Sequence, residues 1–222
     1  MNDISVFDVI GPNMIGPSSS HTAGALRIAR MAKKMVHEAI AEVEFVLYGS
    51  FARTYRGHGT DRALLGGIMG FSAEDKRIRD SYRLADEAGI KYTFRVDENN
   101  QDVHPNTVEI HMKDIKGHEA SVTGVSIGGG NALLKKINGI DVDITGNYET
   151  MIILQDDKPG VAAHVTKCFY EENVNIAFLN IYRHNKGDIA YCVIEADSVI
   201  TEALVEKVKA MPLIKSVNLI QL

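Results

Sequence analysis

The sequence predicts an α+β protein with two domains: an N-terminal mixed α/β domain and a C-terminal β-α-β-β-α-β unit of the ferredoxin-like type. The chain has 222 residues, enough for two ordinary domains, and 45% of them are hydrophobic. Strand-like and helix-like runs mix over residues 1–147, whereas residues 150–222 show a regular β-α-β-β-α-β order. The stretch TGNYE at 145–149 separates the two patterns. We therefore expect domains at 1–147 and 150–222.

The first domain opens with an amphipathic helix expected over 22–41, where apolar residues recur at helical spacing. Gly16 and Pro17 mark the loop before it, and a serine or Thr22 is the expected N-cap. A nearly continuous apolar strand is expected over 43–52, as for a strand covered on both faces. The remaining elements are helices over 60–71, capped by Thr60 or Asp61, and 79–90, ending at Gly89, and strands over 92–96, 107–113, 119–127 and 141–145.

The second domain alternates short apolar strands with two helices. Strands are expected over 151–155, 174–184, 189–197 and 214–222, helices over 162–173 and 200–211, and turns at 156–161 and 185–188. This segment resembles an ACT domain, a regulatory module that pairs with a copy of itself and binds amino acids. The resemblance rests on the element order and on DKPGV, whose Asp157, Pro159 and Gly160 present backbone N–H groups as an effector seat. A plain domain that only mediates dimerisation is the alternative.

Composition excludes several classes of function. The formal net charge of −5 argues against nucleic acid or an anionic membrane as partner. No apolar stretch approaches the ~20 residues of a membrane span, and MNDISVFDVIG lacks the pattern of a signal peptide, so we expect a cytoplasmic protein. The cysteines, Cys168 and Cys192, have no paired metal spacing. We expect buried free thiols and no metal ligands in this chain.

Residues 16–24, GPSSSHTAG, place more polar groups at a helix start than capping requires. One hydroxyl suffices as a cap, so hydroxyls and an imidazole are left beside free N–H groups at the positive end of the helix dipole. Such a place suits a carboxylate or a phosphate. A serine-rich loop with a redundant cap is the alternative. The candidate ligand-binding residues are Ser18, Ser19, Ser20, His21 and Thr22.

A second polar motif, RGHGTDRALLGG at 56–67, repeats this architecture. His58 lies between two glycines, and Thr60 and Asp61 open a helix. The histidine could be a general base, a metal ligand or a substrate clamp, and a surface turn is the alternative. Two such helix N-termini in one domain could converge on one anionic ligand.

Two weaker motifs complete the set. DVHPNT at 102–107 offers His104 and Asn106 before a strand. VSIGGGN at 125–131 frees the backbone to approach a ligand through Gly128–Gly130, although it is neither a P-loop nor a dinucleotide fingerprint.

Together IGPSSSHTAG, GHGTDRALLGG, HPNT and SIGGG, followed by the ACT-like domain, resemble the β chain of bacterial iron–sulfur L-serine dehydratases. The resemblance implies a lyase subunit that helps convert L-serine to pyruvate and ammonia, in amino-acid degradation and gluconeogenesis. It also implies a separate α chain carrying a 4Fe–4S cluster on three cysteines, in agreement with the two cysteines here. A monovalent cation could bind at the ACT-like loops, although no residue pattern requires one.

For that reaction we expect the serine carboxylate at the SSSHT loop, with Gly59, Thr60, His104 and Asn106 as further substrate contacts. His58 is the candidate for orienting substrate or moving a proton, and Asp61 for orienting His58 or pairing with the substrate ammonium.

Two other readings stay open. The first domain also resembles the allosteric substrate-binding domain of some phosphoglycerate dehydrogenases, so a non-catalytic regulator that binds an amino acid or small anion is the alternative. A serine hydrolase using Ser18, Ser19 or Ser20 is weaker, because no GxSxG motif is present.

Overall fold

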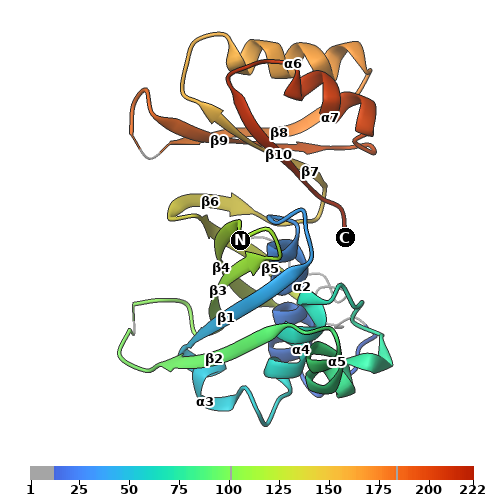
Figure 1. The fold of residues 1–222 in the computed structure, drawn as a ribbon, viewed down its shortest axis with the longest axis vertical. Coiled ribbons are helices and arrows are strands. Elements are labelled where there is room, and N and C mark those ends of the chain that lie inside the picture. Colours follow the sequence, from blue (N-terminus) through green and yellow to red (C-terminus); the bar gives the residue numbers. More distant parts are fainter. Residues whose placement is uncertain (1–12, 101, 184) are drawn as a thin grey trace, which may run out of the picture. The chain divides into compact units, whose positions relative to one another are not determined.

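The computed structural model describes residues 13–100, 102–183 and 185–222. The chain divides into two compact units, Met1–Gly139 and Ile140–Leu222, whose elements are labelled in Figure 1. Residues 1–11, in which no signal-peptide pattern is expected, and His184, the last residue of an expected strand, lie outside the described residues. Within the described ranges, no helix is long and apolar enough to cross a membrane.

Strands β1 to β6 form a six-stranded mixed sheet. Its order is β2-β1-β3-β4-β5-β6, with β1 parallel to β2 and antiparallel to β3, and with β4 antiparallel to both β3 and β5. The strands are β1 Ile40–Tyr48, β2 Lys91–Asp97, β3 Thr107–Asp114, β4 Glu119–Gly128, β5 Asn131–Ile137 and β6 Ile140–Ile144. The chain between β1 and β2 is the helical crossover that a parallel pair requires.

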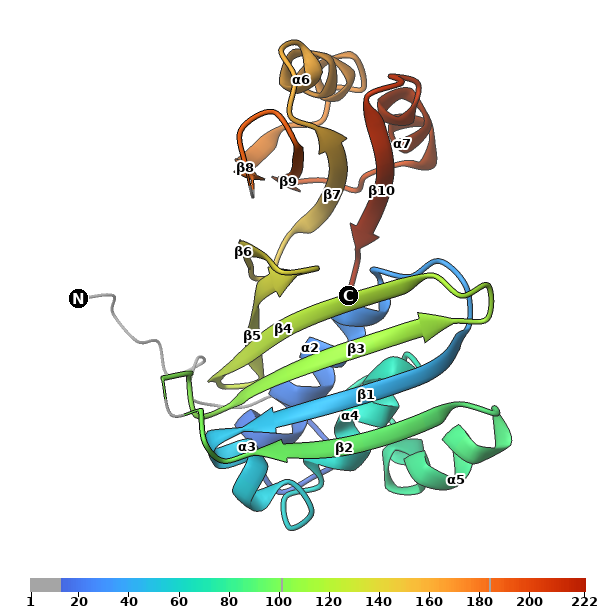
Figure 2. The same ribbon diagram turned by 60° about the vertical axis from the view of Figure 1, so that its left-hand side comes forward.

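Helices cover one face of this sheet (Figure 2). They are the π-helical turn η1 Ser19–Gly24, α2 Ala25–Lys33, α3 Gly49–Thr54, α4 Thr60–Ile68, the 3₁₀ turn η2 Lys76–Asp80 and α5 Ser81–Glu87. Helices α2 and α4 approach closely because Gly67 has no side chain: a Cβ there would lie 2.5 Å from the Leu26 carbonyl oxygen. A Cβ on Gly124 of β4 would similarly lie 2.3 Å from Ile28 of α2. These glycines let the helices seat on the sheet and on each other.

Several expected boundaries of the first domain are wrong. The first helix ends at Lys33, residues 34–39 form a turn, and Ile40 already belongs to β1, where it pairs with Asp114 of β3. The strand expected to reach residue 52 ends at Tyr48, where Gly49, with φ +53°, turns the chain into α3. Strand β5 was not expected, because NALLKKI has no strand alternation of its own. Its pairing with β4 decides its conformation.

The second unit has the ferredoxin-like arrangement that the sequence predicts. Its antiparallel sheet has the order β10-β7-β9-β8. The elements are β7 Glu149–Asp156, α6 Val161–Glu171, β8 Ile176–Arg183, β9 Ile189–Ala196, α7 Glu202–Lys209 and β10 Ile214–Ile220.

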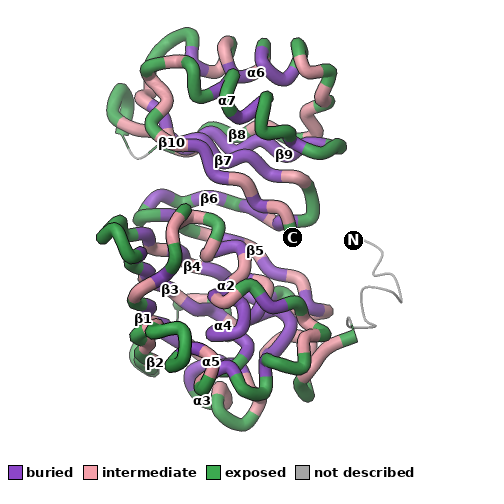
Figure 3. Tube along the Cα trace, turned by 45° about the vertical axis from the view of Figure 1, so that its right-hand side comes forward, coloured by how far each residue is buried: buried purple, intermediate pink, exposed green. Residues whose placement is uncertain are grey.

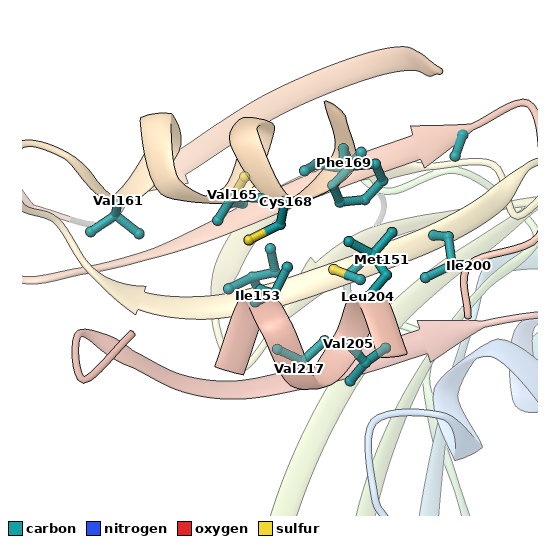
Figure 4. Close-up of a cluster of buried hydrophobic side chains, with 14 residues drawn as sticks. Met151, Ile153, Val161, Val165, Cys168, Phe169, Ile200, Leu204, Val205 and Val217 are labelled. Carbon is teal, nitrogen blue, oxygen red and sulfur yellow. The ribbon is translucent and has the colours of Figure 1, made fainter. Parts of the chain in front are cut away.

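Both helices of this unit lie on one face of its sheet, over a core that includes Met151, Phe169, Leu204 and Val217 (Figure 4). Burial in each unit concentrates on the central strands and on the helix faces turned toward them (Figure 3). The α+β fold class and the ACT-like order are therefore confirmed.

Candidate functional site

The SSSHT loop forms the start of η1, and Ser18 caps it. Ser18 has extended backbone, and its Oγ accepts a hydrogen bond from the His21 backbone N–H at 3.2 Å, as expected for a serine N-cap. The hydroxyls of Ser19 and Ser20 make no hydrogen bond to the part of the chain that the structure describes. Both residues are half-buried, so their hydroxyls remain available to a ligand.

The His21 ring is held from several sides. Its Nε2 lies 2.9 Å from Ser50 Oγ, its Nδ1 lies 3.4 Å from Ser18 Oγ, and the ring meets Phe51 edge-on with centroids 5.3 Å apart. Burial lowers the pKa of His21, and the neighbouring His58 lowers it further. The imidazole is therefore biased toward its neutral form, in which one ring nitrogen donates and the other accepts.

The two polar motifs meet, as the sequence hypothesis required. The rings of His21 and His58 lie 4.7 Å apart between centroids, and Thr22 Oγ1 donates a hydrogen bond to the His58 carbonyl oxygen at 3.0 Å. His58 Nδ1 is buried and has no hydrogen-bond partner among the residues that the structure describes. Since the Thr22 hydroxyl proton is committed to His58, Thr22 fastens one motif to the other. The Thr22 hydroxyl can therefore only accept a hydrogen bond from a ligand.

The residue that caps the start of α4 is not the expected one. The N-cap residue is Gly59, in the left-handed region at φ +67°, and no side chain caps the helix, so the expectation of Thr60 or Asp61 as cap is wrong. Thr60 Oγ1 is buried and accepts or donates no hydrogen bond within the described part of the chain. Gly59 supplies the positive φ at little steric cost, and the two polar side chains that follow it are left for other contacts.

Asp61 is buried at 6% exposure and is bound by Tyr82. Its carboxylate accepts from the Tyr82 hydroxyl at 2.7 Å and from the Arg62 backbone N–H at 2.8 Å. Within the described ranges no hydrogen bond joins Asp61 to His58, so its contacts position the α4 mouth rather than the imidazole. Burial and the Asp61 carboxylate raise the pKa of Tyr82, which keeps the phenol protonated as a donor. Tyr82 was missed because a tyrosine on an amphipathic helix carries no local signal.

The HPNT loop supports the same region. The Pro105 carbonyl oxygen accepts from the backbone N–H groups of Ser50 and Phe51 at 2.6 and 3.3 Å, so the loop binds the start of α3, which carries the partner of His21. His104 is exposed, and its Nδ1 accepts from the Asn106 N–H at 3.2 Å. Ser50, also missed from the sequence, is thus held by a loop that the sequence singled out.

The glycine run after β4 lies beside the SSSHT loop. A Cβ on Gly128 would lie 3.9 Å from Ser20 Oγ, and a Cβ on Gly24 would lie 2.1 Å from Ser126 Oγ. Ser126 is fully buried, and no described residue forms a hydrogen bond with its hydroxyl. The weakest sequence motif is therefore adjacent to the strongest one.

A cavity of about 520 Å³ opens beside His58 and Thr22. It is lined by Met14, Ile15, Gly16, Pro17, Thr22, Arg56, Gly57, His58, Gly59, Arg62, Ile78 and Arg79. The lining joins the loop before η1, the GHG loop and η2. Its arginines were not among the residues that the sequence singled out.

The chain's own cysteines do not fit an iron–sulfur cluster. Cys168 and Cys192 are both buried in the core of the second unit. Burial raises the pKa of both thiols, that of Cys192 to about 12, whereas a metal ligand must be a thiolate. The described residues contain no group of three His, Cys, Asp or Glu side chains placed to hold a metal ion.

The DKPGV turn begins α6, with Gly160 as N-cap in the left-handed region at φ +93°. Asp157 accepts from the Gly187 N–H at 2.9 Å and pairs with Arg183 at 3.2 Å, which ties the turn to the β8–β9 hairpin. The Asp157 N–H itself donates to the Asp188 carbonyl oxygen, so this amide is already used within the turn. Pro159 and Gly160 are exposed.

These features define a class of protein: a chain with a candidate small-ligand site where two helices begin, followed by an ACT-like unit. A family model described as the serine dehydratase beta chain matches residues 5–136, and an ACT domain model matches residues 149–212. The chain therefore belongs to the serine dehydratase beta chain family.

Relatives agree with this membership. The L-serine dehydratase beta chain of Peptoniphilus asaccharolyticus is 43% identical over 204 residues, covering 92% of each chain. A probable L-serine dehydratase beta chain of Bacillus subtilis is 40% identical over 208 residues, covering 94% of each. A D-3-phosphoglycerate dehydrogenase of Bacillus subtilis is 22% identical over 198 residues, 88% of this chain and 37% of that protein. The last similarity agrees with the second resemblance noted in the sequence.

Proposed function

We propose that this chain is the β subunit of an L-serine dehydratase, and that it contributes part of the site that deaminates L-serine to pyruvate and ammonia. The observation that carries the proposal is the meeting of the two motifs, with His21 and His58 ring centroids 4.7 Å apart beside unused serine hydroxyls. Family membership names the reaction class. The partner is an α subunit, as the name "beta chain" of the relatives suggests.

In this proposal the N-terminus of η1 binds the substrate carboxylate. Ser19 and Ser20 are free to donate hydrogen bonds, while Ser18 is used as the cap and Thr22 as the tie to His58. A helix N-terminus favours an anion through its N–H groups and its dipole. Thr60, His104 and Asn106 remain proposed substrate contacts, and His104 and Asn106 require the HPNT loop to approach the ligand.

His58 orients the substrate or moves a proton. Its unpartnered Nδ1 can accept or donate without breaking an existing bond. Asp61 acts indirectly, because Tyr82 and the Arg62 amide hold its carboxylate and so fix the GHGTD turn that carries His58. The substrate ammonium is the other proposed contact of Asp61.

We place the 4Fe–4S cluster on the α subunit. The two cysteines of this chain are buried as protonated thiols, and two cysteines are fewer than the three that the family resemblance implies for the cluster. When bound there, the cluster supplies a Lewis-acidic iron. In this proposal, no residue of this chain coordinates iron.

The experiment is reconstitution with the α subunit and assay of pyruvate from L-serine. The β chain alone is expected to show no turnover. His58→Ala is expected to lower kcat by at least ~10²-fold, as for loss of a proton-transfer group. His37→Ala, an exposed histidine between α2 and β1, is the control and is expected to keep full activity. Unchanged kcat in His58→Ala with weaker ligand binding favours the non-catalytic regulator instead.

The serine hydrolase reading has less support. The Ser18 hydroxyl is occupied as a cap, and neither Ser19 nor Ser20 is bonded to a histidine in the described structure. An active-site serine probe that labels the chain would revive it.

For the second domain we propose residues 150–222 as a dimerising ACT domain, after a first domain over 1–147, in a cytoplasmic enzyme. Strand β8 is an edge of its sheet, and Phe178 and Ile181 on it are 50% and 38% exposed. An effector would bind at the DKPGV turn, where a monovalent cation could also bind. Light scattering of the full chain tests dimerisation: Phe178→Asp is expected to lower the mass to that of a monomer, and a dimer that persists contradicts a β8 interface.

A further inference from the structure

The cavity beside His58 is positively charged. Three guanidinium groups, those of Arg56, Arg62 and Arg79, line it, and no carboxylate of residues 13–100, 102–183 or 185–222 does. The chain as a whole carries a formal net charge of −5, so this concentration of cations is opposite to its average. The lining otherwise consists of glycine backbone, apolar side chains and the His58 and Thr22 side chains.

The arginines of this cavity differ from their neighbours in pairing. Neither Arg62 nor Arg79 makes an ion pair with any described residue. Two arginines of the same stretch that do not line the cavity are paired: Arg77 with Asp75 at 2.6 Å and Arg83 with Glu87 at 2.7 Å. The described carboxylates of this region therefore pair with the arginines outside the cavity and not with Arg62 or Arg79.

The third arginine is partly oriented. The Arg56 guanidinium lies 5.5 Å from the centre of the Tyr55 ring, and its Nε donates to the Tyr55 hydroxyl at 3.2 Å. These contacts leave its terminal nitrogens free for an acceptor. Guanidinium groups bind carboxylate and phosphate oxygens in a bidentate manner, which makes them suited to polyvalent oxyanions.

L-Serine does not account for this site. It is a small zwitterion without net charge, and its carboxylate is already served by the η1 mouth in the proposed function. The cavity volume of about 520 Å³ lies in the range of small-molecule sites and leaves room for a further small ligand. We propose that the cavity binds a second ligand, a small oxyanion with two or more negative charges such as a phosphate or a short dicarboxylate. This goes beyond the proposed function, which assigns only serine to the region.

The test is titration of the full-length chain with inorganic phosphate at constant ionic strength. Binding is monitored by NMR through the amide resonances of Gly57, His58 and Gly59. Saturable shifts are expected. Arg62→Gln combined with Arg79→Gln is expected to weaken binding at least ~10-fold, because two charge-assisted bonds are lost. The matched control, Arg77→Gln with Arg83→Gln, removes the same charge outside the cavity and is expected to bind as wild type does.

Two results would overturn the proposal: no saturable shift at tens of millimolar phosphate, or equal weakening by both double variants. Malonate and acetate distinguish the chemistry, since a divalent carboxylate is expected to compete with phosphate and a monovalent one is not. Acetate competing as well as malonate also contradicts the proposal. Binding is measured on the chain without its partner and without turnover, so an inactive reconstituted enzyme would count against the proposed function alone.

Discussion

Tyr82→Phe removes one oxygen atom and tests how the GHGTD turn is held. The Tyr82 hydroxyl donates to Asp61 Oδ2 at 2.7 Å, and Asp61 is only 6% exposed. After the substitution the carboxylate keeps the Arg62 N–H, at 2.8 Å, as its donor, and phenylalanine preserves the packing of the ring. The change therefore isolates a hydrogen bond to a buried charge.

The expected loss follows from that geometry. A hydrogen bond to a charged group contributes ~1.5–3 kcal/mol, and a buried acceptor left with fewer partners adds desolvation cost. Because one donor remains, we expect about 2 kcal/mol, which corresponds to ~30-fold in an equilibrium constant. Tyr92→Phe is the matched control. Its hydroxyl donates to Asp86 at 3.0 Å, but that pair is exposed, so the expected loss is within ~0.5 kcal/mol.

Native-state hydrogen exchange of peptides covering α4 measures this directly, because it reports the opening of that helix apart from the second unit. Exchange is expected to accelerate ~30-fold in Tyr82→Phe and to stay near wild type in Tyr92→Phe. In the reconstituted enzyme kcat is expected to fall as well, since a small displacement of a positioned group is costly. Equal exchange in the two variants would refute the role assigned to Tyr82.

Three further predictions concern stability and thiol chemistry. Gly67→Ala is expected to cost ~1–3 kcal/mol and lower Tm by calorimetry, since its Cβ would lie 2.5 Å from an α2 carbonyl oxygen, whereas Gly57→Ala, with its nearest neighbour at 3.7 Å, is expected to be neutral. Cys192, whose pKa burial raises to about 12, is expected to react with iodoacetamide at pH 8 only in urea, as mass spectrometry would detect. Burial raises the pKa of Asp114, but hydrogen bonds from His118 and a neighbouring amide outweigh it and lower the pKa overall. The ionised Asp114 carboxylate therefore stabilises the folded state above pH ~4, and this stabilisation is lost as the pH falls further. The stability gap between wild type and Asp114→Asn, measured by urea unfolding, is expected to narrow below pH ~4, and a gap that widens there contradicts this sign.

Much of the second unit could be predicted from the sequence alone. Its strands and helices are short, their apolar periods are clear, and turn residues such as Pro159 and Gly187 separate them. The same holds for the start of η1, where Ser18 acts as the expected cap, but not for the start of α4, where Gly59 takes the place of the expected Thr60 or Asp61 cap. These features depend on local conformational preference, which a sequence displays directly.

The tertiary structure alone decided how these parts meet. Whether Ile40 extends the first helix or opens a strand depends on the pairing of β1 with β3, far along the chain. Ser50 and Tyr82 become site residues only because packing brings them to His21 and Asp61, 29 and 21 positions away in sequence. Their local sequence carries no sign of this, because the free energy that selects such contacts comes from burial and hydrogen bonding between distant segments.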